Sequence, residues 1–252
     1  MALAGIISSQ IRITKRIEEK IIGKYLAKAA VIYAREERLT REAGYDTLYE
    51  LKQKKEQELG IGKFSYTLAD EESKININTA GAEAIASLPG FDLKLAEKVS
   101  SSLLKPFQLK EQVLLVDGVT EEVFEQCKDF ITVYTDGKVN INTAPEEVLK
   151  ALGIGEELAG AIVDFRNGRD SKEATEDDEI FENTGEIINK LRTSRGMSEE
   201  EEAALASLIG AGALTVASKN FSLEIDTKIM DKPAMRYIIV IDDEKIKQWR
   251  EY

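Results

Sequence analysis

The chain has 252 residues, of which 43% are hydrophobic and 32% are charged, so it has room for one large or two modest globular domains. Its formal net charge of −12 is a poor match to a protein that binds nucleic acid or an anionic membrane. Because there is no histidine and only one cysteine, Cys127, the sequence excludes a Ser-His or Cys-His dyad, a histidine metal ligand, an intrachain disulfide and a cysteine-based zinc site.

The first predicted element is a long helix. No proline interrupts residues 6–59, and apolar side chains recur every three or four residues opposite a largely basic face. We therefore predict one helix over this range, with a bend at Gly44. At about 1.5 Å per residue it would span roughly 75 Å, so its first part is expected to project and to bind partner helices. From Tyr25 onward, packing on the chain's own core is an equally good interpretation. The predicted partner-binding residues are Ile13, Ile17, Ile21, Tyr25 and Ile32.

The chain starts with a short apolar segment, residues 1–7. No apolar run reaches the roughly 18 residues of a membrane span, and no secretory signal of the usual form is visible. We expect this segment to be the remainder of a longer span that this sequence lacks. An ordinary helix start is the alternative.

Strands are predicted near both ends of the chain. Residues 64–68 follow a glycine turn, and residues 214–216, 221–229 and 237–241 are rich in β-branched and aromatic side chains. A helix and a strand thus open the chain and strands close it, which predicts an α+β fold with a helical insertion. The predicted domains are residues 1–70 with 213–252, and an inserted domain over residues 71–212. Residues 77–212 contain 13 Lys or Arg and 27 Asp or Glu, so the acidity lies in the insertion.

One sequence pattern occurs twice within this insertion. Residues 74–80 read Lys-Ile-Asn-Ile-Asn-Thr-Ala, and residues 138–144 read Lys-Val-Asn-Ile-Asn-Thr-Ala. The alternation indicates a strand, and Thr143 with Glu146 has the spacing of a capping box. An apolar helical pattern, a glycine turn and a second helical pattern follow in both copies. The sequence therefore predicts two helix-hairpin-helix repeats.

Further elements are predicted between and after the repeats. Residues 111–115 and 120–127 indicate short helices, and residues 130–134 and 138–141 indicate a β-hairpin around Asp136-Gly137. Residues 185–191 and 198–209 indicate two more helices. The second of these begins with Ser198 and Glu201 in capping-box spacing. Four glutamates lie in its first turn, where the helix dipole stabilises them, so we interpret them as a helix start and not as a metal site.

A helix-hairpin-helix can bind DNA phosphate through its hairpin N–H groups. Here Glu156 and Glu157 follow the second hairpin directly, and Asp92 follows the first. Carboxylates at these positions repel phosphate, so we interpret the repeats as packing devices and expect no nucleic-acid partner.

The acidic stretch after the second repeat could hold calcium, which takes six to eight oxygen ligands. It lacks the spacing of an EF-hand, and a solvated acidic loop is the commoner explanation. No cofactor is required by the sequence, and calcium is a possible ligand. The candidate calcium ligands are Asp170, Glu173, Asp177, Asp178 and Glu182. Acid pairs elsewhere have no recognisable catalytic setting, so we predict that the protein is not an enzyme.

The order of these segments resembles one known family. Residues 70–80, Asp-Glu-Glu-Ser-Lys-Ile-Asn-Ile-Asn-Thr-Ala, are similar to the acidic, asparagine-rich leading segment of the type II secretion system minor pseudopilin K. Residues 130–134 followed by 138–145 are similar to the second such segment, residues 218–223 to the return into the sheet, and residues 13–51 to the helix after the membrane anchor. The resemblance covers nearly the whole chain in order.

The resemblance implies a pilin-like fold: a long N-terminal helix on an antiparallel sheet, with a large helical domain inserted. It also implies a non-enzymatic protein of the bacterial inner membrane whose ectodomain faces the periplasm. Such a subunit caps the pseudopilus tip with minor pseudopilins I and J and, by the same resemblance, meets the major pseudopilin and the inner-membrane platform. Some members of this family bind calcium, but their ligands do not map residue by residue onto this chain. The leader and the full apolar anchor are absent from this sequence.

Two alternative functions stay open. The repeats could belong to a DNA-binding helix-hairpin-helix module of a DNA-uptake system. A type IV pilus minor subunit would have the same architecture.

Overall fold

A computed structural model describes the backbone of residues 2–252 and the side chains from Gln10 onward. The chain divides into two compact units. The first comprises Met1–Glu42, Lys52–Ala69 and Phe221–Tyr252, and the second comprises Ala43–Leu51 and Asp70–Asn220. The second unit thus includes residues 43–51 and 213–220, outside the boundaries predicted for the insertion. The expected remnant of a membrane span at residues 1–7 lies outside the described side chains.

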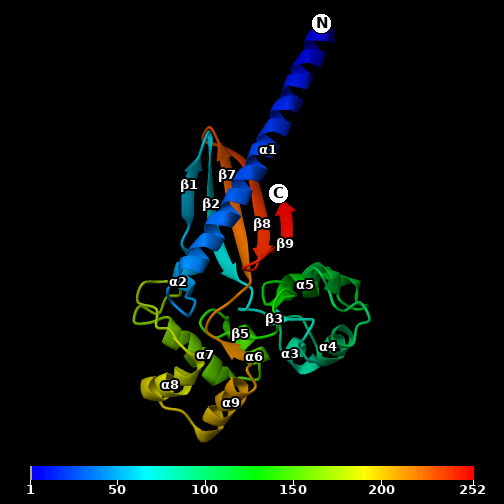
Figure 1. Ribbon diagram of the computed structural model, residues 1–252. Helices are drawn as coiled ribbons and strands as arrows, with labels where there is room; N and C mark the ends of the chain where they lie inside the picture. The colour runs from blue at the N-terminus through cyan, green and yellow to red at the C-terminus, as the bar shows by residue number, and fades with distance from the viewer. Residues whose placement is uncertain (1) are drawn as a thin grey trace. The chain divides into compact units, whose positions relative to one another are not determined.

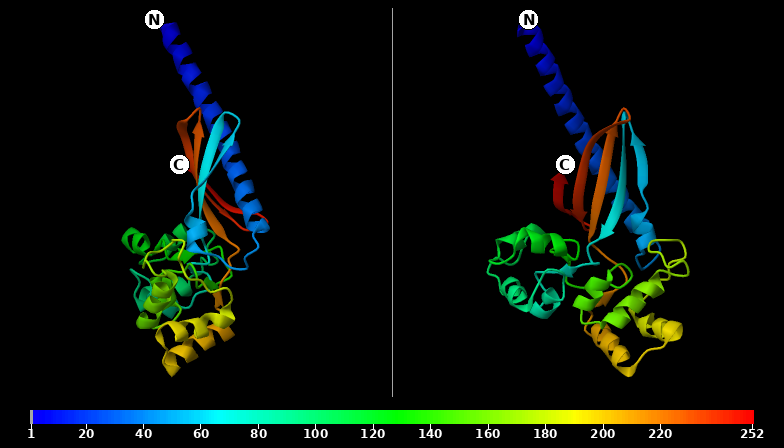
Figure 2. Two further views of the ribbon diagram at one scale, coloured as in Figure 1. Left: turned by 90° about the vertical axis from the view of Figure 1, so that its left-hand side faces the viewer. Right: turned by 180° about the vertical axis from the view of Figure 1, so that it is seen from behind.

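The first unit is a long helix on an antiparallel sheet, as predicted, and the sheet has five strands (Figure 1). The helix is α1 (Ala2–Thr40), and it runs along one face of the sheet and extends beyond the strands (Figure 2). The antiparallel sheet has the order β1-β2-β7-β8-β9. Its strands are β1 (Lys55–Leu59), β2 (Gly62–Asp70), β7 (Phe221–Ile229), β8 (Lys232–Ile241) and β9 (Ile246–Glu251).

Small side chains let α1 approach the sheet closely. A Cβ atom on Gly23 would lie 3.0 Å from the Tyr237 hydroxyl, so only glycine fits at this crossing without displacement. Further along α1, Leu26, Ala30 and Val31 are buried. The core of this unit therefore uses one narrow stripe of α1, and the stripe predicted to bind partners lies on other positions.

The predicted helix over residues 6–59 is too long. α1 ends at Thr40, and after the short helix α2 (Leu48–Lys52) the chain forms β1, which pairs with β2 around a turn at Gly60. The sequence of β1, Lys-Glu-Gln-Glu-Leu, favours a helix by intrinsic propensity. Charged side chains are also what protects an exposed edge strand from pairing with other chains, and β1 is an edge strand.

The second unit contains the repeats. The first consists of β3 (Ile75–Asn76), α3 (Ala82–Ala86), α4 (Leu93–Ser100), the 3-10 helix η1 (Lys110–Leu115), α5 (Glu121–Cys127) and β4 (Ile131–Thr132). The second consists of β5 (Val139–Asn140), α6 (Glu146–Ala151), α7 (Glu156–Arg166), the 3-10 helix η2 (Thr184–Glu186), α8 (Ile187–Arg195), α9 (Glu199–Gly210) and β6 (Leu214–Thr215). In each repeat the first strand pairs in parallel with the last, β3 with β4 and β5 with β6. The unit is thus built twice on one plan, and its core is formed by apolar side chains of both repeats.

Two local predictions in this unit have clear outcomes. The capping box at Ser198 and Glu201 is confirmed, since each side chain accepts a hydrogen bond from the other residue's N–H. The hairpin predicted over residues 130–141 is wrong, because β4 and β5 pair with β3 and β6 and not with each other. The sequence of a short apolar strand does not indicate which distant strand it pairs with, so the nearby Asp136-Gly137 turn favours a local hairpin.

Candidate functional site: the paired helix-hairpin-helix repeats

The two hairpins share a glycine in the left-handed region. Gly90 and Gly153 both have positive φ, +83° and +87°. Gly153 directly follows the C-cap of α6 and ends that helix, whereas Gly90 lies beyond the C-cap of α3, in a turn closed by a bond from the Phe91 N–H to the Leu88 carbonyl. α4 and α7 then begin, and Leu158, Ala159 and Ile162 of α7 are buried as the spacing predicts. The helix-hairpin-helix prediction is therefore confirmed in both copies.

The second asparagine of each repeat clamps a distant phenylalanine. The Asn78 amide donates to the Phe107 carbonyl (2.9 Å) and accepts from the Phe107 N–H (2.7 Å). Asn142 makes the same pair of bonds with Phe181 (2.8 and 2.9 Å). A primary amide satisfies both polar groups of one backbone residue, so these bonds fix the chain where it returns after the second helix.

The first asparagine of each repeat shapes the strand end. The Asn76 side chain accepts from the Asn78 N–H (2.9 Å), and the Asn140 side chain accepts from the Asn142 N–H (3.0 Å). The predicted strand is present as β5, and both Asn140 and Asn142 are buried. Helix α6 is preceded by Pro145 and has no side-chain cap, so the capping box at Thr143 and Glu146 is wrong.

Thr143 instead contributes to a buried polar cluster where the chain enters and leaves this unit. The Asp70 carboxylate accepts from Thr143 Oγ1 (2.5 Å), Ser218 Oγ (2.7 Å), Asn140 Nδ2 (3.1 Å) and the Glu72 N–H (2.8 Å). Four donors on one buried carboxylate tie the second repeat to the segment before the first repeat. We call this set the junction cluster: Asp46, Asp70, Glu72, Asn140, Thr143, Ser218 and Asn220.

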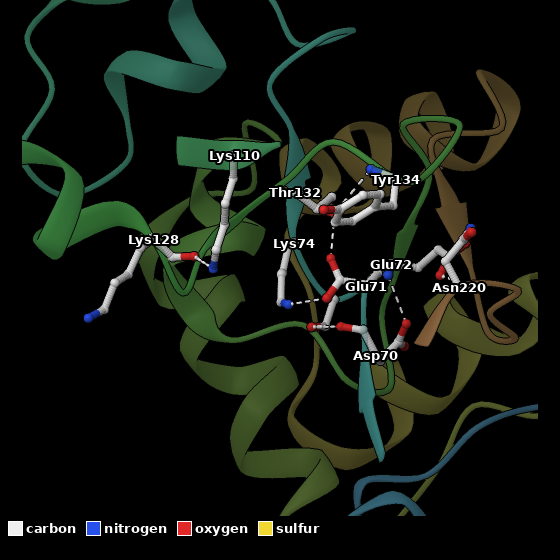
Figure 3. Close-up of polar contacts among 10 residues, drawn as sticks. Asp70, Glu71, Glu72, Lys74, Lys110, Lys128, Thr132, Tyr134 and Asn220 are labelled. Carbon is white, nitrogen blue, oxygen red and sulfur yellow. Dashed lines mark hydrogen bonds and ion pairs between the residues drawn. The ribbon is translucent and has the colours of Figure 1, made fainter. Parts of the chain in front are cut away.

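Two further carboxylates complete the junction cluster. The Asp46 carboxylate accepts from the Ser218 N–H (2.6 Å). Glu72 accepts from the Asn220 side chain (2.6 Å) and N–H (3.1 Å), and Figure 3 shows these two residues beside Asp70. Residues from the segment 43–51 and from both ends of the segment 70–220 therefore meet in one hydrogen-bonded network inside the second unit.

Burial dominates the electrostatics of the junction cluster. It raises the pKa of Asp70 to about 7, with the Glu72 and Asp46 charges acting in the same direction and the hydroxyls of Thr143 and Ser218 opposing. Burial also raises the pKa of Glu72. The protonation of Asp70 and Glu72 is therefore expected to change the stability of the unit.

The neighbouring acid, Glu71, pairs with a cation. Its carboxylate lies 2.6 Å from the Lys74 ammonium and accepts from the Thr132 hydroxyl, which brings the start of the first repeat to its last strand (Figure 3). Lys110 donates to the Lys128 carbonyl (2.5 Å) in the same figure, and burial lowers its pKa. These bonds serve to close the first repeat.

The first hairpin is poorly suited to bind phosphate. A Cβ atom on Gly90 would lie 3.2 Å from the Val123 carbonyl and 3.1 Å from Gln126 Oε1, so α5 lies directly against this turn. The next helix, α4, is capped by Asp92, whose carboxylate accepts from the Leu95 N–H (2.8 Å). The chain's own acceptors thus occupy the place of a phosphate oxygen.

The second hairpin is sterically open but carries the wrong charge. A Cβ atom on Gly153 or Gly155 would meet no atom within 4 Å. The first turn of α7 presents the exposed carboxylates of Glu156 and Glu157, as expected from the sequence. Like charges there oppose phosphate binding, so both hairpins agree with a packing role.

The acidic loop over residues 167–180 turns its carboxylates toward its own backbone. Asp177 accepts from the N–H groups of Arg169 and Asp170, and Asp178 accepts from those of Ala174 and Thr175. Across residues 10–252, no group of three or more acidic or cysteine side chains is arranged to hold a metal ion. The five calcium candidates, Asp170, Glu173, Asp177, Asp178 and Glu182, therefore remain a prediction from the sequence alone.

A buried arginine lies beneath this loop. Arg166 Nη1 donates to the carbonyls of Ile141 and Ala144, both at 2.7 Å. Burial lowers the Arg166 pKa to about 10, against the opposing charges of Glu173 and Asp178. The guanidinium links the end of α7 to the start of its own repeat.

The predicted partner-binding residues on α1 are solvent exposed. Ile13, Ile17, Ile21, Tyr25 and Ile32 are each more than half exposed. From Tyr25 onward the core positions of α1 are different residues, so the stripe is not needed for the fold. In the described chain, no helix is both long and apolar enough to cross a membrane.

Sequence reasoning missed the junction cluster and the asparagine clamps. The signal for the clamps was present, because both asparagines recur in the two copies. Their partners, Phe107 and Phe181, lie 29 and 39 residues further on. Because these two separations differ, aligning the two repeats at a fixed offset does not place Phe107 opposite Phe181.

Comparison with known proteins gives one family model and several partial relatives. A model described as a helix-hairpin-helix motif matches residues 70–132, the first repeat. The endonuclease/exonuclease/phosphatase family domain-containing protein 1 from Homo sapiens is 29% identical over 148 residues, which covers 45% of this chain and 26% of that protein. The protein of the same name from Danio rerio is 31% identical over 127 residues, covering 41% and 23%. The chain thus spans about a quarter of the length of these curated relatives.

A solved structure is similar over nearly the whole chain. It is the GspK-GspI-GspJ complex from the type 2 secretion system of enterotoxigenic Escherichia coli. The match covers 97% of this chain and 96% of the other chain, with 15% sequence identity and a TM-score of 0.61. At this identity the similarity shows a shared fold.

Proposed function

We propose that this chain is a structural, non-enzymatic minor pseudopilin that caps the tip of a type II secretion pseudopilus and takes part in protein export. The observation that supports this most is the fold similarity over 97% of the chain to a pseudopilin complex. The similarity includes both the helix-on-sheet unit and the inserted double repeat. A pilin-like subunit does not require the double repeat, so its presence in the match supports the proposal beyond the pilin-like fold.

The exposed stripe of α1 supplies the partner surface in this proposal. Amphipathic helices bind partner helices through apolar positions three and four residues apart, and Ile13, Ile17 and Ile21 have this spacing. The partners are the minor pseudopilins I and J, with the major pseudopilin and the inner-membrane platform as further contacts. The ectodomain lies in the periplasm, and an apolar anchor on the N-terminal side of α1 holds the protein in the inner membrane.

The second unit supplies the capping property. It is larger than the helix-on-sheet unit and strongly acidic, and its size would hinder another subunit from stacking above it. The proposal therefore predicts a defined complex with partner pseudopilins and no filament of this chain alone.

The chemistry of the chain is consistent with a non-enzymatic role. Its single thiol, Cys127, is buried, and burial raises the thiol pKa to about 11, so little thiolate exists near neutral pH. The junction cluster is buried and holds its carboxylates in hydrogen bonds to the chain's own groups. Such groups stabilise a fold and are not accessible to a substrate.

The proposal is tested by copurification with minor pseudopilins I and J. The wild type is expected to elute with both, and Ile17→Ser/Ile21→Ser is expected to elute alone. Leu115→Ser is the matched control, because Leu115 is 69% exposed but lies in the other unit. Failure of the wild type to bind I and J, or homopolymeric filaments from the anchored form, would refute the proposal.

A second candidate is a DNA-binding module, favoured by the helix-hairpin-helix match over residues 70–132. Fluorescence anisotropy of labelled duplex DNA at low salt gives this candidate its best chance, because phosphate contacts strengthen as salt falls. Saturable binding that weakens steeply with salt, and that Glu156→Lys/Glu157→Lys strengthens, would favour it. A type IV pilus minor subunit has the same fold and is separated from our proposal by the partners that copurify.

A further inference from the structure

The two repeats differ in the loop that leads from the second helix to the clamped phenylalanine. In the first repeat this loop is residues 101–106, between α4 and Phe107, and in the second it is residues 167–180, between α7 and Phe181. The asparagine clamps make the two loops structurally equivalent. The second loop contains six Asp or Glu, whereas the first contains none.

The first loop presents two leucines at the tip of a turn. The Lys105 N–H donates to the Ser102 carbonyl (3.3 Å), and the Leu104 N–H donates to the Ser102 hydroxyl (3.2 Å). Leu103 is 100% exposed and Leu104 is 50% exposed. Turn tips usually carry glycine, asparagine or other polar residues, so neither leucine is explained by the turn or by the core.

The surroundings of this tip are apolar and basic in an acidic unit. Residues 98–110 contain three lysines and no carboxylate, and Leu109 and Pro106 are exposed beside the tip. Lys98 pairs with Asp117 (2.7 Å) and Lys110 donates to the Lys128 carbonyl. Lys105, at the base of the turn, is therefore the cation placed to meet an external anionic group.

We propose that this leucine turn, residues 103–109, docks onto a phospholipid surface. The leucines enter the boundary between headgroups and acyl chains, and Lys105 meets lipid phosphates at that depth. A convex apolar tip needs a deep matching pocket on a rigid protein, whereas a lipid surface adapts to it. Two leucines bury little area, so the contact is weak and reversible. The net negative charge of the unit would repel anionic lipids, but this repulsion is screened beyond roughly 8 Å at physiological ionic strength.

The proposal does not depend on the pseudopilin assignment, and vesicles test it directly. The probe is vesicles of phosphatidylethanolamine and phosphatidylglycerol, with an environment-sensitive dye on Ser101→Cys. The dye is directed to residue 101 because Cys127 is buried and its thiol pKa is raised to about 11. We expect a blue shift of the dye and flotation of the protein with the vesicles. Leu103→Ser/Leu104→Ser should reduce flotation at least about tenfold, since two apolar side chains no longer leave water.

Two controls separate this turn from other apolar surfaces. Leu115→Ser removes an exposed leucine of the same repeat and should leave flotation unchanged. Ile13→Ser/Ile17→Ser tests whether α1 is responsible instead. The proposal fails if the wild type does not float, if flotation depends on α1 and not on the leucine turn, or if the leucines drive self-association of the chain in sedimentation rather than binding to vesicles.

Discussion

Replacing Asp70 by asparagine should remove most of the unusual pH dependence in the stability of the second unit. Burial raises the Asp70 pKa from 3.8 to about 7. The folded state thus binds this proton more tightly than the unfolded state. The stabilisation is fully present below the unfolded pKa, near 3.8, and is lost as pH rises through about 7. The wild-type unit should therefore become more stable on mild acidification.

The size of the effect follows from the shift in pKa. One proton linked to unfolding changes the free energy by about 1.4 kcal/mol per pH unit between the two pKa values, which gives on the order of 4 kcal/mol over the whole window. The raised pKa of Glu72 adds to the change in the same direction. An asparagine side chain cannot ionise, so Asp70→Asn should flatten the slope by up to about 1.4 kcal/mol per pH unit.

Hydrogen exchange measured by mass spectrometry reports on each unit separately. Tryptophan fluorescence would not report on the second unit, because the single tryptophan, Trp249, belongs to the first unit. Peptides from residues 131–144 should gain protection in the wild type as pH falls from about 8 to about 5, after correction for intrinsic exchange. Asp164→Asn, on the exposed side of α7, is the matched control and should keep the wild-type slope. Equal slopes for wild type and Asp70→Asn would refute the reasoning and would mean that four donors keep Asp70 ionised despite burial.

Three further predictions concern the clamps, the thiol and the acidic loop. Asn142→Ala should lower the free energy of unfolding, measured by urea denaturation, by about 2–4 kcal/mol, because the buried N–H and carbonyl of Phe181 lose their partners. Asn183→Ala, at an exposed position, should lower it by less than about 0.5 kcal/mol. Equal losses in the two variants would contradict the clamp. Cys127 should react with a thiol reagent at neutral pH only after urea unfolds the chain, and rapid reaction of the native protein would show that the site opens. EDTA should leave the melting temperature unchanged, and a chain that unfolds in EDTA would overturn this expectation. Calorimetric titration should detect calcium binding only at ~millimolar concentration, because Asp177 and Asp178 already accept hydrogen bonds from loop N–H groups. This weak binding should be lost in Asp178→Asn.

Local sequence signals predicted the elements that depend on periodicity and glycine turns. The apolar spacing along α1 and the paired glycines of the hairpins are contained within a few residues, so the long helix and both repeats were predictable. The end of α1 was not, because residues 55–59 have high helix propensity and become a strand only through pairing with β2. β9, which contains Trp249, was missed for a similar reason, since polar residues alternate there without a clear apolar face.

The candidate site was less predictable than the fold. The sequence pattern places Asn140 in a strand and Thr143 in a helix cap, and the side chains of both residues donate to Asp70 in the interior. Three of the four donors to the Asp70 carboxylate are 70 or more residues away, and such pairing leaves no periodic pattern in one sequence. The charge of α7 could be read directly, because Glu156 and Glu157 follow the second hairpin in the chain.

The bond between the Glu71 N–H and the Asn220 carbonyl (3.0 Å) means that residues 71–220 begin and end side by side. The strands that flank this segment, β2 and β7, are already neighbours in the five-stranded sheet. A short turn could therefore replace the whole segment and leave the strand order intact. In evolutionary terms, the double repeat has the geometry of a cassette that a smaller ancestor could gain in one insertion event. Asp46 lies outside the cassette and accepts from the Ser218 N–H within it, so the cassette is also fastened to the chain between α1 and β1.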